Sequence, residues 1–100
     1  MIKINVKKDN NIIKSIEVNG HAEYADYGKD IVCSAVSSIV TTTINDILTL
    51  DRDAIKYITK DGNITITNLD NDIANKLLNT MLNTLSDLAN DYPKNIKIGG

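Results

Sequence analysis

Apolar and polar residues alternate in two pairs of short segments along this chain, and a longer segment with helical periodicity follows each pair. The first pair covers residues 2–6 and 12–18, whose period of two is typical of half-buried strands. Asp9, Asn10 and Asn11 separate the two segments, and Asp and Asn tolerate the left-handed backbone that tight hairpin turns require. The N-terminal residues are therefore predicted to form a β-hairpin.

Strict alternation also predicts the face on which each side chain of the second strand lies. One face should carry Ile16 and Val18, whereas Ile13 should point to the opposite face. The complete expected sets are Ile12, Lys14, Ile16 and Val18 on the first face, and Ile13, Ser15 and Glu17 on the second.

A second hairpin is expected in the middle of the chain. Residues 54–59 and 63–67 flank Asp61-Gly62, a dipeptide that strongly favours a two-residue hairpin turn. Residues 96–98 alternate Ile with Lys and are predicted to form a short last strand.

Two amphipathic helices are expected after the hairpins. The first should begin at Asp30, a residue type that caps helix N-termini, and end near Leu50. The second should begin after Asp70 or Asn71 and stop at Pro93. The apolar stripe of the first helix comprises Val32, Val36, Ile39, Val40, Thr43 and Ile47.

The resulting order of elements is ββ-α-ββ-α-β over residues 1–100, with no internal domain boundary. Each helix must bury its apolar stripe against another element, and a sheet with one apolar face provides that surface. We therefore expect a single α+β domain of two layers, in which a mixed or antiparallel sheet packs against two helices. A chain of this length can bury one such core.

Charge and hydropathy exclude several classes of function. The formal net charge is −2 and Lys and Arg form no cluster along the sequence, so direct binding of nucleic acid is not expected. Residues 1–8 alternate instead of forming the unbroken apolar run of a signal peptide. No segment resembles the run of about 20 apolar residues that crosses a membrane. We therefore expect a cytoplasmic protein without membrane contact.

No metal or cofactor is expected from the residue types present. One Cys and one His with scattered acids fall short of a metal site, and no glycine-rich phosphate loop occurs. The single Cys also cannot form an internal disulfide, which fits a reducing compartment.

The sole His and the sole Cys form a candidate catalytic pair. His21 follows the second strand, Cys33 lies at the start of the first helix, and residues 22–29 connect them. A helix start favours a thiolate by about 0.3–1 kcal/mol, which is too little to ionise a thiol at neutral pH without a cationic partner. The imidazole of His21 can supply that cation. The alternative is a buried, inert Cys33 beside an exposed His21.

Two polar residues are candidates for supporting this pair. Asp30 either caps the helix or orients His21 through the second ring nitrogen. Ser37 lies one turn after Cys33 on the same helix face, and it either positions the thiol or is an ordinary helix serine.

Two glycines bound the connection between the candidate residues. Gly20 directly precedes His21, and Gly28 can supply a backbone angle that other residues resist. We expect residues 22–29 to form a mobile gate over the site, with Gly28 absorbing the backbone change. The alternative is a surface loop without such a role.

The central residues resemble the Prp family of ribosomal-processing cysteine proteases. The resemblance is specific over residues 20–37, and the order of elements agrees on both sides of this stretch. The residues that carry it are Gly20-His21-Ala22, Gly28 and Asp30-Ile31-Val32-Cys33-Ser34-Ala35-Val36-Ser37.

The resemblance implies a cysteine endopeptidase in which His21 and Cys33 form the catalytic dyad, supported by Asp30 and Ser37. The implied substrate is a large-subunit ribosomal protein, whose N-terminal extension is removed after a hydrophobic, Phe-rich motif. The alternative is a non-catalytic, ribosome-associated module that only binds the same peptide. No oxyanion-binding side chain is evident, so backbone N–H groups at the helix start, including that of Cys33, are expected to serve.

The resemblance also implies a homodimer. The helix expected over residues 72–92 carries a wide apolar face at Leu78, Met81 and Leu82, and surplus apolar surface of this kind favours association with a second copy.

Overall fold

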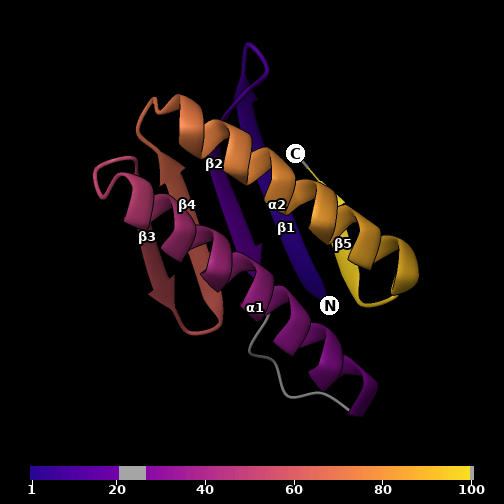
Figure 1. The fold of residues 1–100 in the computed structure, drawn as a ribbon. Helices are drawn as coiled ribbons and strands as arrows, with labels where there is room; N and C mark the ends of the chain where they lie inside the picture. The colour runs from indigo at the N-terminus through magenta and orange to yellow at the C-terminus, as the bar shows by residue number, and fades with distance from the viewer. Residues whose placement is uncertain (21–26, 100) are drawn as a thin grey trace.

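The computed structural model describes residues 1–20 and 27–99, and it confirms an α+β domain in which two helices cover one face of a five-stranded sheet (Figure 1). The elements follow the predicted order ββ-α-ββ-α-β. They are β1 (Ile2–Asp9), β2 (Ile12–Asn19), α1 (Tyr27–Leu50), β3 (Ile55–Lys60), β4 (Asn63–Asn68), α2 (Asp72–Asp91) and β5 (Ile96–Gly99).

The sheet is mixed, with strands in the order β3-β4-β2-β1-β5. Antiparallel ladders join β3, β4, β2 and β1, whereas β5 pairs parallel with β1. The parallel pair is possible because α2 carries the chain across the sheet before β5 begins. Figure 1 shows both helices in front of the sheet, so neither of them covers the opposite sheet face.

Both predicted hairpin turns are confirmed. Asn10 and Asn11 have φ of 53° and 65°, and Asp61 and Gly62 have φ of 45° and 82°. Two consecutive residues with positive φ give a turn whose twist matches that of the flanking strands, and Asn, Asp and Gly adopt this conformation at the lowest cost.

Aliphatic side chains fill the space between the helices and the sheet, as expected for a chain without Phe or Trp. Val32, Val36 and Val40 recur every fourth residue along α1 and are at most 1% exposed. Burial of one side chain of this size contributes about 1.5–3 kcal/mol to folding. This stripe fixes the rotation of α1 about its axis, and therefore the direction of every other side chain on the helix.

The segment Ile31–Leu50 of α1 is long and apolar enough, by length and composition, to cross a membrane, although no such segment was expected from the sequence. Its buried side chains form a single stripe that packs on the sheet, and Ser and Thr occupy many of the remaining positions. We therefore interpret α1 as the core helix of this domain.

The sheet face predicted for the Ile13 side chain is wrong, because β2 departs from strict alternation at Lys14. The ladder between β1 and β2 shifts register here, which makes Lys14 the extra residue of a β-bulge. The bulge turns Ile13 to the buried face of Ile16 and Val18, while Ile12 is 39% exposed. Alternation inverts at a bulge, and the single sequence gives no sign of the inserted residue.

The predicted start of the first helix is also wrong. The helix begins at Tyr27, so Asp30 lies inside it and is not the N-cap residue. An N-cap side chain is worth about 1 kcal/mol, whereas each added helical residue contributes a further backbone hydrogen bond. Gly28 is compatible with the extended helix, since a helical Gly costs only about 1 kcal/mol.

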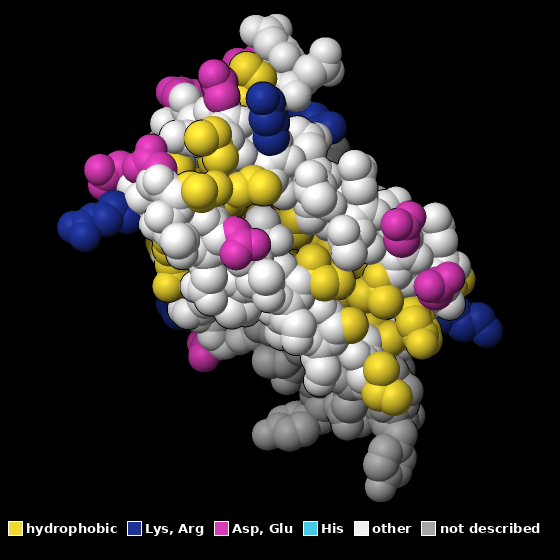
Figure 2. Space-filling view, viewed as in Figure 1, with side chains coloured by type: hydrophobic (Ala, Val, Ile, Leu, Met, Phe, Trp, Pro, Cys, Tyr) yellow, Lys and Arg dark blue, Asp and Glu magenta, His cyan; other side chains and the backbone are white. Residues whose placement is uncertain are grey.

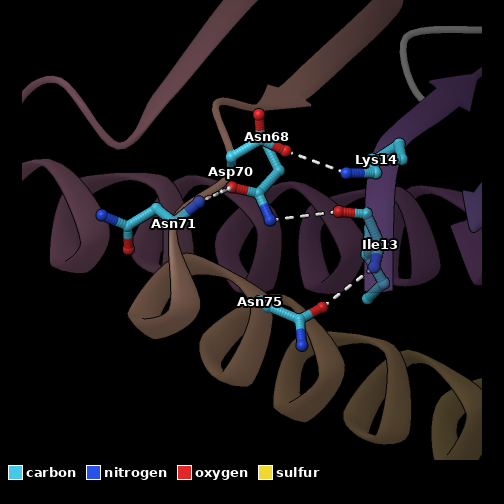
Figure 3. A network of polar contacts seen from close by, with 6 residues as sticks. All are labelled: Ile13, Lys14, Asn68, Asp70, Asn71 and Asn75. Carbon is cyan, nitrogen blue, oxygen red and sulfur yellow. Dashed lines mark hydrogen bonds and ion pairs between the residues drawn. The ribbon is translucent and has the colours of Figure 1, made fainter. Parts of the chain in front are cut away.

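A polar network ties the bulge to the segment between β4 and α2 (Figure 3). The buried Asn68 side chain donates from Nδ2 to the Ile13 carbonyl at 3.0 Å, and its Oδ1 accepts the Asn71 N–H at 3.0 Å. The Ile13 N–H in turn donates to Oδ1 of Asn75 at 2.9 Å. Both backbone groups of Ile13 are thus satisfied by side chains at the place where the bulge interrupts the ladder.

Asn71 is the N-cap of α2, which decides between the two predicted candidates. Its Oδ1 accepts the Ala74 N–H at 2.9 Å. Asp70 instead has a φ of 57° and pairs with Lys14 at 2.8 Å. The Lys14 ammonium lowers the pKa of Asp70, and Asp70 raises the pKa of Lys14. The pair therefore stabilises the fold at neutral pH, and this contribution is lost as acid protonates Asp70.

We expect Asn68→Ala to lower the free energy of unfolding by about 2–4 kcal/mol, because the Ile13 carbonyl and the Asn71 N–H would remain buried without partners. Chemical denaturation of purified protein measures this. The matched control is Thr67→Ala, an exposed neighbour on the same strand, which should change stability by about 0.5 kcal/mol or less. Equal destabilisation of the two variants would contradict the role assigned to Asn68.

The apolar face that was expected to mediate dimerisation through the second helix is buried within one copy of the chain. Leu78 and Met81 are 0% and 2% exposed, and Leu82 packs partly buried against the core. Leu78 and Met81 belong to the domain's own core, so they provide no surface for a second copy, whereas Leu82 stays partly exposed.

Candidate active site

Cys33 lies on α1 directly beside the buried stripe. Val32 precedes it and is 1% exposed, whereas Cys33 itself is half-buried and packs against the edge of the core. A thiol in this position is held by its neighbours on one side and reached by solvent on the other. This arrangement is compatible with a nucleophile and differs from a fully buried, inert cysteine.

Ser37 lies one helical turn after Cys33, as predicted, and is likewise half-buried. Residues four apart stand above one another on a helix, so both side chains project from the same flank of α1. The buried Val36 adjoins Ser37 in the way that Val32 adjoins Cys33. The core thus sets the orientation of both polar side chains.

Gly20 fixes the point from which the chain leaves the sheet. It follows the last residue of β2, has a φ of 84°, and donates its N–H to the Gly62 carbonyl at 3.2 Å. This left-handed angle disfavours any residue with a Cβ. The hydrogen bond to the turn between β3 and β4 therefore fixes the position of the backbone at Gly20, where the chain leaves β2.

Other predicted site features lie outside the described residues. His21 and residues 22–26 belong to this part of the chain, so the distance from His21 to Cys33 stays a prediction. The gate expected over residues 22–29 is wrong in its extent, because residues 27–29 belong to α1, and for residues 22–26 it stays a prediction. Gly28 and Asp30 lie in the first turn of α1 by their backbone, and their side-chain environment is not described.

The earlier start of α1 changes the electrostatics expected at Cys33. The thiol lies in the second turn of the helix, beyond the first turn in which the helix dipole acts most strongly. The N–H of Cys33 also lies within the helical hydrogen-bonding ladder, so it is not one of the free N–H groups at the helix start. The expectation that this N–H binds an oxyanion is therefore wrong.

The described part of the chain brings together no group of three His, Cys, Asp or Glu side chains that could hold a metal ion.

Hydrophobic side chains gather on the helical face of the molecule, in a band between α1 and α2 (Figure 2). Partly buried hydrophobic residues that pack against the core include Cys33 and Ile39 of α1 and Leu88 and Ala89 of α2. The N-terminal half of α1 lies on the same side of the molecule as the C-terminal half of α2 (Figure 1). The thiol thus belongs to the more apolar side of the domain, which suits a partner with apolar side chains.

The sequence matches a known family and curated relatives over nearly its whole length. The family model described as cysteine protease Prp matches residues 1–97. The ribosomal processing cysteine protease Prp of Staphylococcus aureus is 33% identical over 103 aligned positions, which cover 98% of this chain and 97% of that protein.

Solved structures agree with this match. An essential ribosomal processing protease Prp from S. aureus, in complex with a substrate peptide, superposes with a TM-score of 0.92 at 27% identity, with both chains covered completely. The same enzyme with a covalently linked product peptide gives a TM-score of 0.88 at 29% identity, covering 99% of this chain and 98% of that one.

Proposed function

The chain belongs to the Prp family of ribosomal-processing cysteine proteases and is itself a cysteine endopeptidase, and we propose that Cys33 and His21 are its catalytic dyad. One observation carries the assignment: the sequence contains one cysteine and one histidine. A cysteine protease needs a thiol nucleophile and a group that transfers protons to and from it. Cys33 is the only residue available for the first role and His21 the only imidazole for the second.

The first half of the reaction forms an acyl-enzyme. The Cys33 thiolate attacks the carbonyl carbon of the scissile peptide bond, and a C–S bond forms as negative charge moves to the carbonyl oxygen. The His21 imidazolium then protonates the departing amine, the C–N bond breaks, and the acyl group remains on the sulfur as a thioester. Free N–H groups of the first turn of α1 are available to stabilise the oxyanion.

The second half restores the enzyme. Neutral His21 takes a proton from water as the water oxygen attacks the thioester carbonyl. The C–S bond breaks, the peptide leaves as a carboxylic acid that releases its proton to solvent water, and the thiolate–imidazolium pair is regenerated. In this scheme Ser37 positions the thiol from the neighbouring turn, and Asp30 helps to orient the His21 ring.

We propose as substrate a large-subunit ribosomal protein with an N-terminal extension, cut after a hydrophobic, Phe-rich motif. The band of hydrophobic side chains between the helices supports this choice, because Phe side chains need an apolar surface to displace water favourably. Cytoplasm is the compartment we propose, since ribosomal proteins are made and assembled there.

The test is to incubate the protein with the extended ribosomal protein of the same organism and to follow its intact mass. We expect removal of the N-terminal segment, with the released peptide ending in the hydrophobic motif. A substrate in which Ser replaces the Phe residues of that motif should be cleaved at least about tenfold more slowly, because burial of each aromatic ring contributes roughly 1–3 kcal/mol. An unchanged substrate mass after prolonged incubation would contradict the proposal.

We also propose that the enzyme is a homodimer, on family resemblance alone, because Leu78 and Met81 of the expected interface are buried. Sedimentation that finds only an 11.0 kDa species at micromolar concentration would contradict this. The alternative of a module that binds the peptide without cutting it is not retained, because the family is one of proteases.

A further inference from the structure

The sheet face opposite the helices gathers lysines that are far apart in the sequence. Strand register aligns Lys60, Lys3 and Lys97 in one row across all five strands. Lys3 and Lys97 point away from the core because their strand neighbours Ile2, Ile4 and Ile96 are buried beneath the helices. Lys60 shares their face through the ladders that join it to Asn63 and Asn63 to Asn19. The complete row is Lys60, Asn63, Asn19, Lys3 and Lys97.

A second row with lysines at both ends lies four residues further along the strands. It joins Lys56 on β3 to Lys7 on β1 through Thr67 and Ser15. The row between the two carries the only carboxylate of this face among the described residues, that of Glu17, which accepts a hydrogen bond from Asn19. This middle row is Ile58, Thr65, Glu17, Asn5 and Gly99.

The charge of this face is opposite to that of the chain as a whole. Five exposed lysines and one glutamate give it a formal charge of 5 − 1 = +4, in a protein whose net charge is −2. The ion pair between Lys14 and Asp70 uses none of these five ammonium groups. We call this surface, defined by Lys3, Lys7, Lys56, Lys60 and Lys97, the lysine face.

We propose that the lysine face docks the enzyme on the phosphate backbone of double-stranded RNA. The expectation of no contact with nucleic acid rested on the absence of a cluster along the sequence, and the sheet creates that cluster in space. Lysines attract phosphates as point charges, and the Thr, Ser and Asn side chains between them can donate hydrogen bonds to phosphate oxygens.

The residues of the lysine face favour a duplex over a single strand. Single-strand binding relies on aromatic side chains on which bases stack, and the three rows contain no aromatic residue. Strands about 4.8 Å apart place Lys60 and Lys97 about 19 Å from each other, and the outer rows lie about 13 Å apart. Such separations let the lysines contact phosphates several nucleotides apart without reading the bases.

The choice of RNA over other polyanions rests on the proposed function, because a ribosomal substrate is assembled among RNA helices. Docking on RNA would raise the local concentration of enzyme near its substrate. Cys33 lies on α1, and both helices cover the sheet face opposite the lysine face (Figure 1). RNA on one side therefore leaves the other side free for the peptide.

The experiment measures fluorescence anisotropy of a labelled RNA duplex of roughly 20 base pairs titrated with the full chain. Affinity should fall about 500-fold between 50 and 200 mM salt if the five lysines contact phosphates. The triple variant Lys3→Gln, Lys60→Gln and Lys97→Gln should bind at least about tenfold more weakly at 50 mM salt. Its slope of log affinity against log salt should be shallower by roughly 0.9 for each phosphate that the variant no longer neutralises.

The matched control removes the same charge elsewhere. Lys8, Lys76 and Lys94 are exposed and lie outside the three rows, so their triple Gln variant should keep most of the affinity. Equal weakening in the two triple variants would overturn the proposal, as would the absence of duplex binding by the wild-type protein. Competition by polyglutamate or by phosphatidylglycerol vesicles as effective as that by the duplex would also overturn it. So would loss of a dimer in the lysine-face variant, because the face would then be an interface between copies.

Cleavage of a short peptide separates this inference from the proposed function. The lysine-face variant should cleave an isolated extension peptide at the wild-type rate, because the peptide carries no RNA. Failure of both proteins to cleave it would count against the proposed function and leave the RNA titration as an independent result. Normal cleavage with no difference in RNA binding would count against the lysine face alone.

Discussion

Replacement of Cys33 by Ala is expected to lower the cleavage rate by about 10³-fold or more while leaving substrate affinity within a few-fold of wild type. Without the sulfur no thioester forms, and removal of a nucleophile abolishes most of an enzyme's acceleration over water. Affinity for the substrate peptide should persist because the change removes only the sulfur atom of one half-buried side chain beside the core. Initial rates from intact-mass spectra and peptide anisotropy measure the two quantities.

Two further variants sharpen this test. Cys33→Ser keeps the shape of the side chain and should be nearly as inactive, because a hydroxyl at this site is a far weaker nucleophile. Ser34→Ala changes the adjacent exposed residue and should leave the rate within about twofold, as surface substitutions usually do. Wild-type cleavage by Cys33→Ala protein would exclude the thiol from the mechanism, whereas loss of activity in Ser34→Ala would point to disruption of α1.

Replacement of His21 by Ala is expected to have the second largest effect, on both cleavage and chemical modification. Cleavage should fall at least about 10²-fold, because protonation of the leaving amine loses its donor. Alkylation of Cys33 by iodoacetamide at pH 6.5 should slow about tenfold or more, since the thiolate would lose its imidazolium partner. The position of Cys33 in the second turn of α1 strengthens this expectation, because the helix dipole acts mainly on the first turn.

The pH profile of alkylation distinguishes pairing from a merely structural role for His21. The profile of His21→Ala protein should differ from that of the wild type, with slower alkylation near neutral pH. The control is Ser37→Ala, which removes a hydroxyl from the same flank of α1 and keeps the proposed ion pair. Superimposable profiles for His21→Ala and wild-type protein would show that the two residues do not interact. A shift in the Ser37→Ala profile as well would assign the effect to general disruption of the helix.

Local pattern was sufficient to predict the order of the elements and the chemistry of the candidate pair. The positive φ angles at Asn10 and Asp61 follow from residue type, because few other residues accept a left-handed backbone. The stripe of Val32 and Val36 follows from a spacing of four, since one face of a helix must be apolar to be buried. The nomination of Cys33 and His21 needed no structure, because the chain offers one residue of each type.

Register and burial could not be obtained in this way, because both depend on partners that are distant in sequence. Leu78 is apolar in any context, and only its packing in the tertiary structure decides that it belongs to the core and not to an interface. Ile13 points inward because the ladder with β1 accommodates a bulge, and the distant Asn68 satisfies its carbonyl.

The lysine face also depends on partners that are distant in sequence. Alternation along β1 determines that Lys3 points away from the apolar Ile2 and Ile4 next to it in sequence. The alignment of Lys3 with Lys60 and Lys97 in one row is decided by strand order and register, which place β3 and β5 at opposite edges of one sheet. A sequence determines the period of each segment through short-range sterics, whereas the charge of a surface is a sum over neighbours that only the tertiary fold brings together.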